Sequence, residues 1–139
     1  MSGITFQSKL IHSSDPSIVL PVLNILSSSL VKINLEFLKR NPGFPSLFET
    51  GVYYKREPVG QENWKDIPTT LEDSHGDCED LASWLAAEYI MSNTKANAYV
   101  YLAKETPRVK TYHVVVKYLD SNGKTQYIDP SAMLGMNQI

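Results

Sequence analysis

The sequence predicts one α+β domain, in which a helical half is followed by an antiparallel half. Two segments, 17–40 and 78–89, are predicted to be helices, because apolar residues recur in each at three- and four-residue spacing. The sheet is predicted from segments 98–102, 111–119 and 124–129, which are dense in strand-forming residues and are separated by turn sequences. A chain of 139 residues is long enough to bury a sizeable core as a single unit.

The first 60 residues are predicted to form an arm, a long helix and a loop, and residues 61–139 the functional core. Segment 4–10 alternates apolar and polar residues, as an edge strand does. The helix follows Ser13-Ser14-Asp15-Pro16, which supplies cap chemistry, and Asn41-Pro42-Gly43 ends it. Pro21 predicts a later start or a kink. The expected apolar stripe is Leu23, Leu26, Leu30, Ile33 and Phe37, widened by Val22, Ile25 and Leu38.

Segment 41–75 is rich in Pro and is predicted to be mostly irregular, with a short strand at 52–54 and a covering loop at 64–70. Long irregular segments in compact domains often line functional sites. Order is expected here because aromatic residues gain most from burial. The aromatic residues of this segment on which the expectation rests are Phe44, Phe48, Tyr53, Tyr54 and Trp64.

The single cysteine lies at the predicted start of the second helix, where Asp77 can cap the free amide groups. Cys78 then falls in the first turn on the apolar face, and aligned amide groups there favour a thiolate. The neighbouring acids Asp77, Glu79 and Asp80 oppose this effect. Two interpretations follow: a nucleophile, or a small buried hydrophobic residue.

A histidine and an aspartate lie on the last two predicted strands, and the turn between them decides whether they can meet. Asp120 followed by Ser121-Asn122-Gly123 favours a three-residue hairpin loop, with Gly in the left-handed position. Asp129 would then lie opposite Val115, on the face that carries His113. A two-residue Asn122-Gly123 turn would place the two side chains on opposite faces.

Together these residues predict a Cys–His–Asp triad. His113 would remove the proton from Cys78, and Asp129 would orient the imidazole. The backbone N–H of Cys78, which the helix start leaves unpaired, would be one oxyanion donor. Candidates for the second donor are Trp64, Asn63 and Gln61.

Three motifs also carry a family resemblance. They are Gly76-Asp77-Cys78-Glu79-Asp80-Leu81-Ala82, Tyr112-His113-Val114-Val115-Val116 and Ile128-Asp129-Pro130-Ser131. In this order they resemble the transglutaminase-like cysteine enzymes: a Gly-x-Cys helix start, a His at a strand start, and an Asp-Pro closing the next strand. The match covers about residues 64–136 and looks closest to short transglutaminase-like proteins encoded by phages and prophages.

The resemblance implies a papain-like core, in which the helix carrying Cys78 packs on an antiparallel sheet carrying His113 and Asp129. It also implies acyl transfer from an amide of a protein or peptide, by hydrolysis, deamidation or transamidation. No metal or cofactor is expected. A virion or interaction module that keeps the fold without catalysis is the alternative.

A zinc site is a further alternative, with His75, Cys78 and His113 as ligands and Asp77 or Asp129 nearby. The acidic residues around the helix start lack the spacing of a calcium loop.

Composition excludes several partner classes. The net charge of −2 gives no basic patch for nucleic acid, and one cysteine excludes an intrachain disulfide. Neither a secretory leader nor a membrane span is expected, because polar residues interrupt the apolar segment 18–38. We therefore expect a cytoplasmic or virion-associated protein, and the sequence leaves its oligomeric state open.

Overall fold

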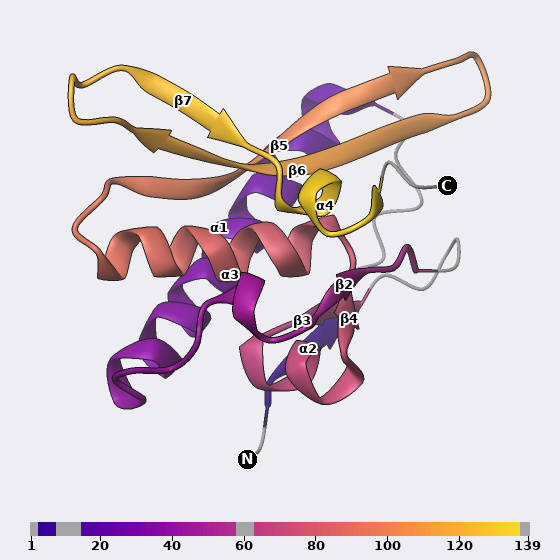
Figure 1. Cartoon of the computed structure of the whole chain (residues 1–139). Helices are drawn as coiled ribbons and strands as arrows, with labels where there is room; N and C mark the ends of the chain where they lie inside the picture. The colour runs from indigo at the N-terminus through magenta and orange to yellow at the C-terminus, as the bar shows by residue number, and fades with distance from the viewer. Residues whose placement is uncertain (1–2, 8–14, 58–62, 137–139) are drawn as a thin grey trace.

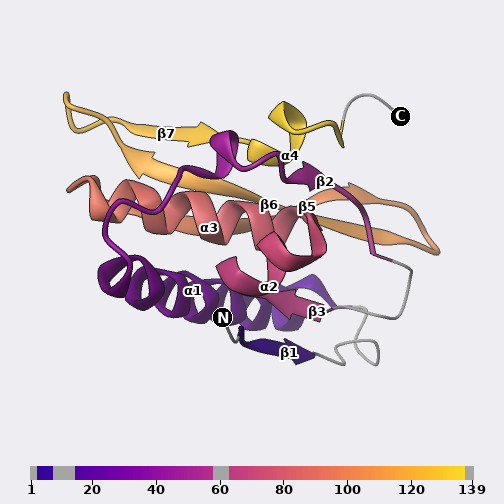
Figure 2. The same cartoon turned by 60° about the horizontal axis from the view of Figure 1, so that its bottom comes forward.

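The computed structural model describes residues 3–7, 15–57 and 63–136, and its elements form three layers (Figures 1 and 2). One layer is an antiparallel sheet of β5 (Ala96–Glu105), β6 (Lys110–Leu119) and β7 (Thr125–Ile128), in that order. Helix α3 (Cys78–Met91) lies between this sheet and α1 (Pro16–Arg40). The mixture of helix and sheet agrees with the α+β prediction.

Helix α1 begins at Pro16, so the later start that Pro21 allowed is wrong. Asp15 caps it by accepting a hydrogen bond from the Ser17 N–H at 3.0 Å, and Pro21 lies inside the helix. By length and composition it is the one helix of the described residues that could cross a membrane. Here it packs against α3 and β5.

The buried face of α1 differs from the predicted stripe. Ile25, expected to widen the stripe, is 65% exposed, whereas the polar residues Ser27 and Asn34 are fully buried. Asn34 is buried because its Oδ1 accepts a hydrogen bond from the Ile67 N–H at 2.9 Å. The amide side chain thus joins α1 to the start of a second, shorter helix, a role that hydrophobic periodicity does not reveal.

Segment 41–75 is far more regular than predicted. It contains a 3-10 turn (Leu47–Glu49), β2 (Tyr53–Tyr54), β3 (Asn63–Lys65), α2 (Ile67–Asp73) and β4 (His75–Gly76). The short strand at β2 is confirmed, and it pairs in parallel with β4. β3 pairs antiparallel with β1 (Thr5–Gln7), as the edge-strand prediction requires for that part of the arm. Residues 8–14 lie outside the described chain.

The predicted covering loop at 64–70 is wrong, because this segment forms β3 and the first turn of α2. Asp66 caps α2 by accepting the Thr69 N–H at 3.1 Å, and Pro68 stands in the first turn, where its missing N–H costs nothing. The cap signal was present in the sequence, but the helix is too short to show a clear periodicity.

Helix α3 begins after Asp77, as predicted, and residues 78–87 are all buried. A single apolar stripe was expected, but α1 covers one side of the helix and the sheet covers the other. Asn93 follows the helix in the left-handed conformation (φ 64°).

The hairpin register is confirmed. Val116 pairs with Ile128, so Asp129 follows opposite Val115. The three-residue loop is closed by the Gly123 N–H, which donates to the Asp120 carbonyl at 3.0 Å, and Gly123 has a φ of 76°. His113 and Asp129 therefore lie on the same face of the sheet.

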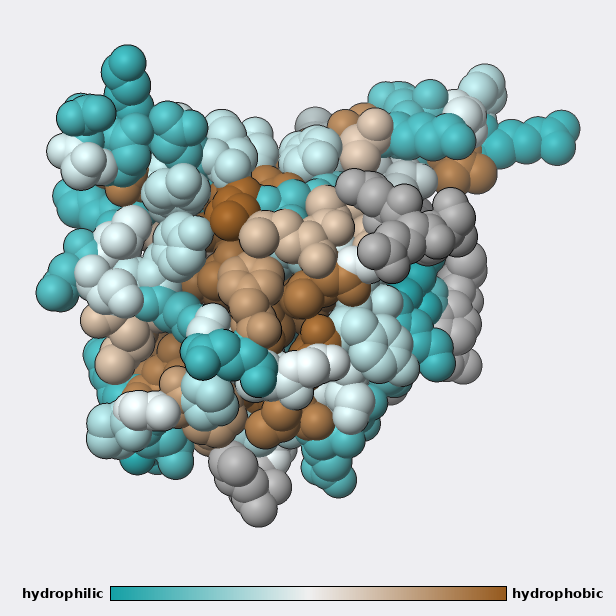
Figure 3. Space-filling model, in the orientation of Figure 1, coloured by the Kyte–Doolittle hydropathy of each residue, from teal (hydrophilic) through white to brown (hydrophobic). Residues whose placement is uncertain are grey.

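The chain then turns into α4 (Pro130–Met133), which packs beside α3, β2 and β6. The Tyr54 N–H donates to the Leu134 carbonyl at 3.0 Å, which ties β2 to this C-terminal turn. Hydrophobic side chains gather in the middle of the face shown in Figure 3, below the sheet, and mostly hydrophilic ones cover the protruding hairpins.

Candidate active site

His113 and Asp129 form the firmest contact of the candidate site. Nε2 of His113 lies 2.7 Å from Oδ2 of Asp129. The other oxygen, Oδ1, accepts hydrogen bonds from the Ser131 and Ala132 N–H groups at 3.1 and 3.3 Å, because Asp129 is the N-cap of α4. The carboxylate is therefore fixed by a helix start on one side and holds the imidazole on the other. Nδ1 of His113 remains for another partner.

The thiol of Cys78 lies at the edge of β6. The backbone N–H of Val114, the residue after His113, lies near enough to the sulfur to lower the pKa of Cys78. This N–H is available because the ladder between β6 and β7 ends at the pair Val116–Ile128. The structure thus pairs His113 with Asp129 and places Cys78 beside Val114, the next residue of β6, without a hydrogen bond between the sulfur and the imidazole among the described residues.

The thiol does not have the environment of a preformed thiolate. Burial raises the pKa of Cys78 well above its usual range, and the negative charges of Glu79 and Asp77 raise it further. The Val114 N–H lowers this pKa without offsetting them. The thiol donates to Oε2 of Glu79 at 3.5 Å, and only 9% of the residue is exposed. Of the opposing effects expected at the helix start, burial and the acidic neighbours outweigh the aligned amides.

The predicted oxyanion donors also need correction. The Cys78 N–H is not free, since it donates to Oδ1 of Asp77 at 2.7 Å. Trp64 packs in the core at 2% exposure, and the Asn63 N–H donates to Oε2 of Glu57 at 2.7 Å. Gln61 lies outside the described residues. We assign the oxyanion role to none of them.

Two tyrosines that the sequence interpretation did not place at the site lie beside it. Tyr101 pairs with His113 across the sheet, and their rings meet edge to face with centroids 5.7 Å apart. Burial raises the pKa of Tyr101, and the charges of Asp129 and Cys78 add to the effect. Tyr54 pairs with Gly76, and burial together with the charges of nearby acids and of Cys78 raises its pKa. Both phenols therefore stay neutral hydrogen-bond donors. The Tyr101 pairing could be found only from the register of β5 against β6.

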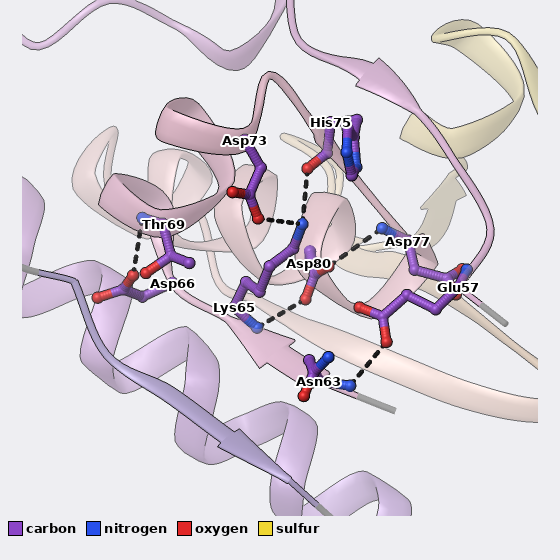
Figure 4. Close-up of polar contacts among 9 residues, drawn as sticks. All are labelled: Glu57, Asn63, Lys65, Asp66, Thr69, Asp73, His75, Asp77 and Asp80. Atoms are coloured by element: carbon purple, nitrogen blue, oxygen red, sulfur yellow. Dashed lines mark hydrogen bonds and ion pairs between the residues drawn. The ribbon is translucent and has the colours of Figure 1, made fainter. Parts of the chain in front are cut away.

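A buried acid holds the backbone that precedes the thiol (Figure 4). Oδ1 of Asp80 accepts the Lys65 N–H at 2.8 Å, and Oδ2 accepts the Asp77 N–H at 3.1 Å. The Lys65 ammonium group in turn contacts Asp73 at 3.0 Å and the His75 carbonyl at 2.9 Å. β3, β4 and the start of α3 are therefore joined through one lysine and one aspartate.

The structure does not place the two histidines of the zinc alternative in a group of potential metal ligands with Cys78. In the described part of the chain, the groups of three potential ligands are Asp77, Cys78 and Glu79, and Glu57, Glu79 and Asp80. Neither group includes His75 or His113. The His75 ring lies against Tyr53 instead, with centroids 5.7 Å apart.

No protein-family model matches this chain, and neither a curated protein nor a solved structure matches it. The transglutaminase-like resemblance accordingly rests on the three sequence motifs.

Glu79→Gln is expected to speed alkylation of Cys78 by iodoacetamide at pH 8. The substitution removes one of the charges that raise the thiol pKa, and a drop of one pKa unit corresponds to about tenfold more thiolate. The rate is measured by intact-mass spectrometry, with Glu36→Gln on the exposed side of α1 as the control. An unchanged rate in a folded Glu79→Gln protein would contradict this account of the thiol.

Proposed function

We propose that this chain is a cysteine-dependent amide-bond hydrolase or acyl transferase of the peptidase, isopeptidase or deamidase type, with a papain-like, transglutaminase-like core. The observation that carries the proposal is the position of Cys78 beside the strand that carries the His113–Asp129 pair. The His113–Asp129 hydrogen bond measures 2.7 Å, and the N–H of Val114, the residue next to His113, lies near enough to the sulfur to lower the pKa of Cys78. Three residue types with these roles, drawn from three separated segments, are what nucleophilic acyl transfer requires.

In the proposed reaction, Nδ1 of His113 takes the Cys78 proton as the sulfur attacks the substrate carbonyl carbon. Asp129 stabilises the imidazolium through Nε2. The tetrahedral intermediate collapses when the C–N bond breaks, and His113 gives its proton to the leaving amine. A thioester on Cys78 remains. Water, deprotonated by His113, then attacks the thioester, which releases a carboxylic acid and restores the thiol.

The buried, neutral thiol sets a condition on this chemistry. A sulfur that rests as a thiol must lose its proton during attack, so general-base catalysis by His113 is essential. The hydrogen bond to Glu79 must also break before the thiol can turn to the imidazole. If an amine replaced water in the second half of the reaction, the same residues would perform transamidation.

The burial of Cys78 also favours one alternative, a non-catalytic phage structural or interaction protein that retains the fold. A cysteine that is buried and whose thiol is hydrogen-bonded to a carboxylate is a poor nucleophile at rest. The two proposals differ in whether the thiol forms an acyl intermediate.

A panel of amide substrates tests the proposal. The wild type and Cys78→Ala are incubated with peptides, peptides carrying glutamine side chains, and peptidoglycan stem peptides, each with and without a primary amine. We expect a wild-type product that Cys78→Ala does not form, and an acyl adduct on Cys78 in intact-mass spectra after rapid acid quenching. Equal behaviour of both proteins on every substrate would favour the structural protein.

A further inference from the structure

The sheet has a face that no helix covers in the described residues (Figures 1 and 2). Side chains alternate along each strand, and Ala98, Val100, Val114 and Val116 belong to the core beside α3. The residues between them project to the other side. They include Tyr99, Tyr101, His113, Lys117 and Tyr127.

The tyrosines of this face form a continuous series of ring contacts that ends at the candidate base. Tyr127 meets Tyr99 at 5.6 Å between centroids, Tyr99 meets Tyr101 at 6.3 Å, and Tyr101 meets His113 at 5.7 Å. Tyr99 remains 36% exposed and Tyr127 55% exposed. We refer to Tyr99, Tyr101 and Tyr127 as the tyrosine face.

We propose that the tyrosine face binds an extended polypeptide, namely the part of the substrate that flanks the amide held at Cys78. This inference rests on the proposed function. Its first support is continuity, because Tyr101 touches His113, and a chain whose amide lies beside His113 is directed onto the neighbouring rings. Tyrosine also supplies large contact area at a small cost in side-chain entropy, which is why it is common in binding surfaces.

The spacing of the rings suits an extended peptide. Alternate side chains of an extended peptide lie roughly 6.6 Å apart, close to the ring spacings of this face. The ring planes of Tyr99 and Tyr127 are inclined by 56° and those of Tyr101 and His113 by 89°, whereas Tyr99 and Tyr101 are nearly parallel at 21°.

One charge on this face makes the expected partner more specific. The Lys117 ammonium group lies over the Tyr99 ring, 5.4 Å from its centroid. A substrate carboxylate beside Tyr99 would gain an ion pair with this group. The expected ligand is therefore a peptide with apolar or aromatic side chains at alternate positions and an acidic residue nearby.

The test uses the full chain carrying Cys78→Ala, so that binding is measured without turnover. A displayed library of random heptapeptides is selected on this protein, and an enriched sequence is synthesised with a fluorescent label. We expect enrichment of alternating apolar or aromatic residues with an acid. Adding Tyr99→Ser and Tyr127→Ser should raise the Kd of the labelled peptide at least tenfold. Phe48→Ser, which changes a 41% exposed ring on the 3-10 turn, is the matched control.

Three results would overturn the inference: no enriched peptide, equal Kd values with and without the tyrosine substitutions, or binding of chitohexaose instead of the peptides. Thermal unfolding midpoints show whether the serine variants remain folded, and Tyr99→Phe with Tyr127→Phe should keep the affinity. Cleavage of the same peptide by the wild type is scored separately. Binding without cleavage would support peptide binding by the tyrosine face and contradict the proposed function.

Discussion

His113→Ala is expected to lower turnover of an amide substrate by roughly 10²- to 10⁴-fold, the usual contribution of a positioned general base. The effect should lie near the upper end, because burial and two acids raise the pKa of the Cys78 thiol, so thiolate does not form without a base. Iodoacetamide labelling of Cys78 at pH 7 should slow in the same variant. Both rates are measured on protein whose folding has been checked by circular dichroism.

The matched control is His75→Ala, which removes the other described histidine from its contact with Tyr53 and should leave both rates unchanged. Asp129→Asn should give a smaller loss than His113→Ala, because the base remains but its orienting carboxylate is lost. If His113→Ala labelled and turned over as fast as the wild type, the triad would have no catalytic role.

The pairing of His113 with Asp129 could be predicted because it depends on local chemistry. Asp120 and Gly123 fix a three-residue loop, and a loop length fixes the register and face of every residue in the hairpin. The start of α3 was likewise predictable, since Asp77 carries its own cap signal. Both predictions needed only residues that are neighbours in sequence.

The state of the thiol could not be predicted, because it depends on what surrounds the helix start in space. The sequence shows acids beside Cys78, but it does not show that α1 and the sheet bury the helix from both sides. That burial turns nearby carboxylates from weak, solvated neighbours into the reason for a raised pKa. The occupied Cys78 N–H follows from the same cap that was correctly predicted, since the Asp77 carboxylate accepts it.

Segment 41–75 shows a similar limit. Strands of two or three residues and a seven-residue helix are too short for a periodic signal, so their order comes from partners elsewhere in the chain. Asn34 supplies one such partner by binding the first residue of α2, and Asp80 supplies another by binding Lys65. Asn34, a polar residue within a predicted apolar helix, is thus the sequence feature that points to its contact with α2.

Asp80→Ala is expected to cause the largest loss of stability among substitutions near the site. It leaves the Lys65 and Asp77 N–H groups without their acceptor, at about 1–3 kcal/mol for each buried group. Urea unfolding at pH 7 measures the free energy of unfolding. Asp80→Asn keeps one acceptor oxygen and should lose less.

The pH dependence gives an independent check on Asp80. Burial raises its pKa in the folded state well above 3.8, although the two N–H groups and the Lys65 charge act in the opposite direction. The folded protein therefore binds this proton more tightly than the unfolded chain does. The stabilising contribution is complete below about pH 4 and is lost as pH rises through the folded pKa. The advantage of wild type over Asp80→Asn should accordingly shrink as the pH rises from about 4 through the raised folded pKa. An advantage that grows over this range would mean that Lys65 and the amide groups stabilise the carboxylate more than burial destabilises it.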